Sequence, residues 1–78
     1  MEKLYIYESH LGDLYAYDFM LDDKDLYCEQ CGDWDWLIGS AATRAEAWDL
    51  LKDITDIDGS GGYNLEYVQE FIQTYWRE

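Results

Sequence analysis

The stretch Cys28-Glu29-Gln30-Cys31-Gly32 constrains the fold of this 78-residue chain more than any other feature. It holds the only two cysteines of the sequence. A chain of this length buries only about 60–65% of its unfolded surface, so its hydrophobic core is marginal. Domains shorter than roughly 80 residues often add a disulfide, a metal ion or a partner subunit. The two cysteines are therefore candidates for a structural cross-link.

A Cys-x-x-Cys-Gly turn can hold one metal ion, because both thiolates face the same point and backbone amides support the first sulfur. Gly32 can take the positive φ that such a turn often needs. Structural zinc has four ligands, and the single histidine, His10, is the candidate for the third. Asp33 is the first candidate for the fourth ligand, and Asp13, Glu8 or water are the others. Two thiolates and an imidazole favour zinc over calcium or magnesium. The predicted zinc ligands are Cys28, Cys31, His10 and Asp33.

Other interpretations of the cysteine pair stay open. A reducing cytosol argues against a lasting disulfide. A thioredoxin-like redox pair would open a helix within a βαβ unit, and the sequence shows no such unit. The cysteines can also be free buried thiols, and His10 an ordinary polar residue of a turn. We expect a structural site and not an enzyme, because no nucleophile–base pair is visible.

Alternating apolar residues predict strands in the first half of the chain. Residues 3–9 and 14–20 form a predicted β-hairpin around a turn at 10–13. Residues 22–25 read as a polar turn, and shorter strands at 26–28 and 34–38 flank the cysteine loop.

Capping signals and helical spacing predict two helices in the second half. Thr43 and Glu46 fit a capping box, and Asn64 can cap the last helix. The apolar residues predicted to face the core are Ala47, Leu50, Leu51, Ile54, Val68, Phe71, Ile72 and Tyr75. The predicted fold is a single α+β domain over residues 1–78. It has a small antiparallel sheet of about four strands, in ββββαα order, covered by two helices, with a zinc knuckle at a hairpin tip.

The chain is strongly acidic, with eighteen Asp and Glu against five Lys and Arg and a formal net charge of −13. This charge exceeds the range of about 2–8 that suits a small domain, so a positively charged partner is expected. Direct binding to nucleic acid is not, because there is no basic patch for phosphate. The sequence offers neither a signal peptide nor a membrane span, so we expect an intracellular protein. The residues predicted to contact the partner are Trp34, Asp35, Trp36, Asp22, Asp23 and Asp25, with Trp76 as a further candidate.

The loop at residues 56–61 imitates the opening of an EF-hand calcium loop, with Asp56, Asp58 and Ser60 at the first, third and fifth positions. The twelfth position should be a bidentate Glu but is Tyr67. We therefore favour a Gly- and Asp-rich turn between two helices over a calcium site.

Small size, acidity, many aromatic residues and one metal knuckle together resemble the phage-encoded anti-CRISPR proteins of the type II class, in particular a zinc-containing member. The residues that carry the resemblance are 7–10 (Tyr-Glu-Ser-His) and 28–39. The resemblance implies stoichiometric binding, in the cytoplasm of a bacterial host, to the single-chain RNA-guided nuclease. That binding would stop target DNA from loading. The nuclease holds nucleic acid in a positively charged channel, which an acidic domain can occupy as a DNA mimic. The alternative is a zinc-stapled interaction module for another basic nucleic-acid-binding protein.

Overall fold

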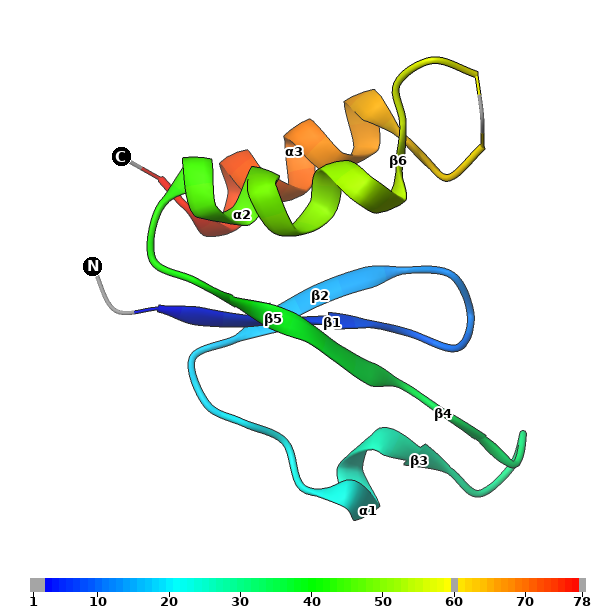
Figure 1. Cartoon of the computed structure of the whole chain (residues 1–78). Coiled ribbons are helices and arrows are strands. Elements are labelled where there is room, and N and C mark those ends of the chain that lie inside the picture. Colours follow the sequence, from blue (N-terminus) through cyan, green and yellow to red (C-terminus); the bar gives the residue numbers. More distant parts are fainter. Residues whose placement is uncertain (1–2, 60, 78) are drawn as a thin grey trace.

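The centre of the molecule is a three-stranded antiparallel sheet with the strand order β2-β1-β5 (Figure 1). The computed structural model describes residues 3–59 and 61–77. The three strands span Leu4–Glu8 (β1), Leu14–Tyr17 (β2) and Trp36–Ala41 (β5). β1 lies in the middle and pairs antiparallel with both neighbours. The α+β class and the first hairpin are as predicted.

Two helices cover one face of this sheet (Figure 1). They are α2 (Arg44–Leu51) and α3 (Leu65–Tyr75). The predicted caps are confirmed: the Thr43 hydroxyl accepts a hydrogen bond from the Glu46 amide at 3.2 Å, and the Asn64 side chain accepts one from Glu66 at 2.8 Å. Each cap satisfies an amide that the first helical turn leaves without a partner.

The connection from α2 to α3 is held by short elements. A 3₁₀ turn, η1 (Lys52–Ile54), follows α2, and β6 (Thr55–Asp56) pairs in parallel with β7 (Tyr63–Asn64). The Tyr67 hydroxyl accepts a hydrogen bond from the Leu14 amide at 2.9 Å, which ties α3 to β2.

The hydrophobic core lies between the sheet and the two helices. Its buried members are Ile6, Leu14, Ala16, Ala41, Ala47, Leu51, Val68, Phe71, Ile72 and Trp76. Trp76 is 0% exposed, and its indole N–H donates to the Ala41 carbonyl at 2.9 Å. The prediction that Trp76 contacts a partner is therefore wrong. The backbone leaves helical geometry at Trp76, so this ring is buried while Tyr75, a predicted core residue, stays 36% exposed.

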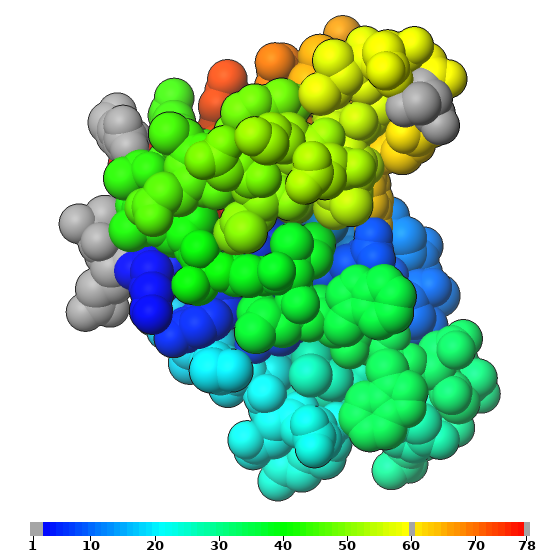
Figure 2. Space-filling view, viewed as in Figure 1, coloured from blue at the N-terminus to red at the C-terminus, as the bar shows by residue number. Residues whose placement is uncertain are grey.

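The segment of residues 18–35 connects β2 to β5 and lies on the sheet face opposite to α2 and α3 (Figure 1). We call it the cysteine lobe; it is the cyan to green part at the bottom of Figure 2. Its elements are α1 (Asp23–Leu26), where a turn was predicted, and the strand pair β3 (Tyr27–Cys28) and β4 (Asp33–Trp34).

The sheet has three strands instead of the predicted four because β3 pairs with β4 and not with the sheet. The predicted strand at 34–38 is interrupted at Asp35, whose amide donates to the Leu26 carbonyl at 2.8 Å. Within the described ranges, none of the helices combines the length and the apolar character needed to cross a membrane.

Candidate metal centre

Two turns from different parts of the chain meet at one end of the molecule. The turn between β1 and β2 carries His10 and is closed by a hydrogen bond from the Ser9 amide to the Asp13 carbonyl at 2.7 Å. The turn between β3 and β4 carries both cysteines. Its Gly32 has a φ of +72° and donates its amide to the Cys28 carbonyl at 2.8 Å. The positive φ predicted for this glycine is confirmed.

The ligand atoms of His10, Cys28 and Cys31 all lie within 4.8 Å of one another. Both cysteines are free thiols, so no disulfide occupies the site. A nitrogen and two sulfurs at this separation can close around a single ion, and the group could therefore hold a metal. The predicted meeting of the two turns is confirmed.

The histidine ring is fixed by Asp35, which the sequence did not single out for this role. One Asp35 oxygen lies 2.6 Å from His10 Nδ1 and also accepts the His10 backbone amide at 2.9 Å. The other oxygen accepts the Tyr15 hydroxyl at 2.7 Å. Nδ1 thus carries the proton, which leaves the lone pair of the imidazole on Nε2.

His10 Nε2 is buried and has no hydrogen-bond partner among the described residues. A buried polar atom without a partner is rare in folded proteins and calls for an explanation, such as a bound ion. A carboxylate that holds one ring nitrogen, with the other nitrogen left to bind the ion, is the usual arrangement of a metal-binding histidine. The chemistry of the donor set therefore fits a metal ion.

The charges around the site are mutually coupled. The hydrogen bond to Asp35 raises the pKa of His10, although burial opposes it, and the Cys28 sulfur adds to the rise. Burial works to raise the pKa of Asp35, but the hydrogen bonds from His10 and Tyr15 outweigh it and the pKa falls. Hydrogen bonds from the Cys31 thiol and from the Cys31 and Gln30 amides lower the pKa of Cys28. Cys28 is thus the sulfur that ionises first.

The second thiol behaves in the opposite way. Its hydrogen bond to Cys28 is the largest cause of the raised pKa of Cys31, followed by burial and by the negative charges of Cys28 and Asp33. A divalent cation would remove this conflict, because it attracts both sulfurs at once.

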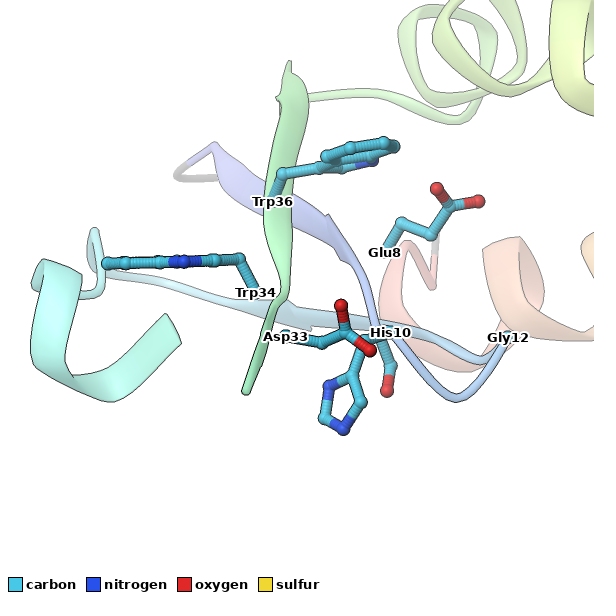
Figure 3. Close-up of a pocket in the computed structure, with 7 residues that line it drawn as sticks. Glu8, His10, Gly12, Asp33, Trp34 and Trp36 are labelled. Carbon is cyan, nitrogen blue, oxygen red and sulfur yellow. The ribbon is translucent and has the colours of Figure 1, made fainter. Parts of the chain in front are cut away.

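The predicted fourth ligands do not join the group of converging ligand atoms. Asp33 and Glu8 line an adjacent hollow of about 410 Å³ together with His10 and Trp36, as Figure 3 shows. The Glu8 carboxylate accepts the Tyr63 hydroxyl at 2.8 Å and is thereby held away from the sulfurs. Asp13 is exposed, and among the described residues the converging set has three members.

The residues predicted to contact a partner divide into two kinds. Trp34 and Trp36 are 52% and 62% exposed, and their rings extend to opposite sides of the chain in Figure 3. The three acidic residues at 22, 23 and 25 are exposed as well. The Asp35 side chain, in contrast, is 16% exposed and engaged with His10 and Tyr15, so it acts inside the site.

The calcium-like loop has a simpler local explanation. The Asp56 side chain accepts the Gly59 amide at 2.7 Å, which makes a turn within the loop. Neither Asp56 nor Asp58 belongs to a group of three or more converging metal ligands in the described ranges, and Ser60 lies outside them. Tyr67, which stands where the bidentate Glu should be, is used to anchor β2.

Sequence reasoning missed two members of this site, Asp35 and Tyr15. In the run Asp33-Trp34-Asp35-Trp36, acidic and aromatic residues alternate, so the sequence does not show which of the two carboxylates points into the site. A comparison of the chain with protein-family models, with curated proteins and with solved structures gives no match.

Proposed function

We propose that this chain is a zinc-stabilised acidic binding domain that inhibits a nucleic-acid enzyme by occupying its cationic surface. One observation carries the metal part of the proposal: the ligand atoms of His10, Cys28 and Cys31 converge while Asp35 fixes the imidazole ring through Nδ1. Two thiolates and an imidazole suit zinc better than calcium, magnesium or manganese, which prefer oxygen.

The metal is proposed to act structurally, because it lies where the hydrophobic core is absent. Among the described residues, none from 17 to 40 is buried, although this stretch contains the whole cysteine lobe. An ion held by His10 on one turn and by two sulfurs on the other would fasten the lobe to the sheet. The described residues supply three converging ligands and Asp33 stands outside them, so a water molecule would take the fourth position of the zinc.

The binding part of the proposal rests on charge and on exposed aromatic area. The net charge of −13 favours fast association with a cationic surface. Trp34 and Trp36 are exposed, and large aromatic residues commonly supply the strongest contacts of an interface. The proposed partner is the type II RNA-guided nuclease, whose nucleic-acid channel is cationic. Binding would be stoichiometric and would stop target DNA from loading. The alternative partner is another basic nucleic-acid-binding protein.

The metal proposal is tested on freshly purified protein by elemental analysis. About one zinc per chain is expected in the wild type, with loss of zinc in Cys28→Ser and in His10→Ala. The control is Asp53→Asn, which removes an exposed carboxylate away from the site and should keep its zinc. A wild type free of zinc that also fails to take up added zinc would contradict the proposal.

The partner is tested with the guide-loaded nuclease and with an unrelated basic protein of similar charge. We expect one-to-one binding to the nuclease that weakens as the salt concentration rises from about 0.1 to 0.5 M, because screening shortens the range of electrostatic attraction. Equal binding to both proteins would mean that the chain recognises positive charge in general and not the nuclease. Migration of the chain with bare DNA would contradict it.

A further inference from the structure

A second hollow lies between the cysteine lobe and the sheet, on the side away from α2 and α3. Its volume is about 550 Å³. Its lining combines aromatic rings and carboxylates, from Tyr15, Tyr17, Phe19, Leu21, Asp25 and Asp35. No Lys or Arg is among these lining residues, and Asp25 has no cationic neighbour within the lining.

The aromatic rings of the hollow form a continuous stack. Tyr15 stacks on Tyr7 with the ring centroids 5.3 Å apart and packs edge-on against Tyr17 at 5.6 Å. Tyr17 then stacks on Phe19 at 5.3 Å. The inner end of the stack is buried at Tyr7, whereas Tyr17 and Phe19 are 43% and 53% exposed. The outer rings thus leave aromatic surface exposed to a ligand of the hollow.

The two carboxylates differ in what they can offer. Asp35 is already occupied by His10 and Tyr15, so its carboxylate is held in place where it lines the hollow. Asp25 is exposed and can turn toward a ligand at the rim. The same sheet face already attracts one cation, because the Lys3 ammonium lies 5.6 Å from the centre of the Tyr5 ring.

We infer that this hollow binds the guanidinium group of an arginine side chain presented by the protein partner. A planar guanidinium stacks on aromatic faces and is weakly hydrated, so it can leave water for a half-apolar hollow. Its fork of donors also matches a carboxylate such as Asp25. An ammonium group is compact and strongly hydrated and fits such a hollow less well. This inference rests on the proposed function, since it names the side chain of the cationic partner that the domain would capture.

The hollow is also physically connected to the metal centre. Asp35 lines the hollow and holds the His10 ring, and Tyr15 contributes both to the aromatic stack and to the Asp35 hydrogen bonds. Loss of the ion would free the cysteine lobe, which carries one wall. Guanidinium binding should therefore weaken when the metal is removed.

The test is a two-dimensional NMR titration of the full metal-loaded chain at about 150 mM salt, where long-range attraction is screened. The probes are the acetylated, methylamidated forms of arginine, lysine and citrulline, the last being neutral and close to arginine in shape. We expect arginine to shift the ring signals of Tyr15, Tyr17 and Phe19 with a dissociation constant on the order of millimolar. Lysine should bind several-fold more weakly, and citrulline should not bind.

Two pairs of variants sharpen the titration. Phe19→Ala and Asp25→Asn should each weaken arginine binding about fivefold, because each removes one cation contact. Ile57→Ala truncates another exposed apolar side chain and Asp53→Asn neutralises another exposed carboxylate; neither residue lines the hollow, and both changes should leave the affinity unchanged. Equal shifts with arginine and lysine, insensitive to Phe19→Ala, would overturn the inference.

A parallel measurement separates this inference from the proposed function. If the guide-loaded nuclease binds the wild type and Phe19→Ala equally well, the arginine hollow is wrong and the proposed function stands. If the arginine probe binds in the hollow but the nuclease does not bind at all, the proposed partner is wrong and the hollow stands.

Discussion

The two faces of the central sheet are held in different ways. On one face, α2 and α3 bury a core that contains Leu51 and Trp76, both fully buried. On the other face, the cysteine lobe covers Tyr7, which is 1% exposed, yet none of the lobe's own described residues is buried. The lobe is attached by polar contacts, such as the hydrogen bond from the Leu21 amide to the Tyr7 hydroxyl at 2.8 Å.

This difference gives a physical reason why this small acidic domain would bind a metal. Burial of apolar area stabilises the helical side without further help. A segment without buried residues has little to set against the entropy lost when its backbone is ordered. Three converging ligands at the contact between lobe and sheet can supply what is missing, because metal binding stabilises the folded state directly. At ordinary temperature the helical side should therefore stay folded after metal removal, with a lower melting temperature, whereas the lobe should lose its order.

Removal of the metal should produce the largest effect. At a free zinc concentration a thousandfold above the dissociation constant, binding stabilises the fold by about 4 kcal/mol. For a domain of this size, that corresponds to a fall in melting temperature of roughly 15–30 °C on chelation. The measurement is calorimetry with and without chelator. Cys28→Ser should melt at the lower temperature already, and chelator should not lower it further.

Truncation of a core side chain on the helical side should produce the second-largest effect and should leave the metal bound. Leu51→Ala is expected to lower the free energy of unfolding by roughly 2–5 kcal/mol, through lost burial and the cavity left behind. Urea unfolding of the metal-loaded protein measures the loss, and Ile57→Ala, at a 60% exposed position, should change little. A parallel drop in the zinc content of Leu51→Ala would contradict this expectation, because it would mean that the helical side and the cysteine lobe fold as one cooperative unit.

Loss of the carboxylate that orients the imidazole should have a smaller effect, seen first in the metal affinity. Asp35→Asn should weaken zinc binding about 10- to 100-fold, as losses of such supporting groups do. Competition with a chromophoric chelator measures the affinity, and Asp33→Asn is the matched comparison. A larger effect from Asp33→Asn would identify that residue as a ligand in place of water.

The smallest effect should be the pH dependence of the metal-free chain. Since the folded-state pKa of His10 is raised above 6.5, its contribution to stability is fully present below pH 6.5 and is lost as pH rises through the raised value. The stability difference between the wild type and His10→Gln, both metal-free, should thus shrink from pH 6 to pH 8. The metal-loaded wild type should gain stability over the same range, because zinc requires deprotonated ligands. Urea titrations at three pH values measure both quantities. The expectation is wrong if the metal-free stability difference and the stability of the metal-loaded wild type change with pH in the same direction.

The features that the sequence predicted correctly are those set by near neighbours. Thr43 and Asn64 cap helices through amides two or three residues away, and the Gly32 turn needs only its own backbone freedom. His10 could be placed beside the cysteines because both lie at turns between strands. Such local rules hold whatever the rest of the chain does.

The features that the sequence did not reveal depend on distant partners. β3 pairs with β4 alone, and the hydrogen bond from the Asp35 amide to the Leu26 carbonyl accompanies this pairing; no local sequence pattern indicates either. The inward turn of Asp35 is held by distant donors, two from His10, 25 positions earlier in the chain, and the hydroxyl of Tyr15. Trp76 displaces Tyr75 from the core because the helix ends there and its indole finds the Ala41 carbonyl.

The central claim is that a metal ion fastens the cysteine lobe to a sheet that is otherwise held by its helical side. Native-state hydrogen exchange, followed residue by residue with one equivalent of zinc and then with excess chelator, tests it most directly. We expect chelation to remove protection from the amides of residues 25, 26, 32 and 35, whose hydrogen bonds lie within the lobe, while those of α3 stay protected. Equal protection of the lobe amides with and without zinc would contradict it.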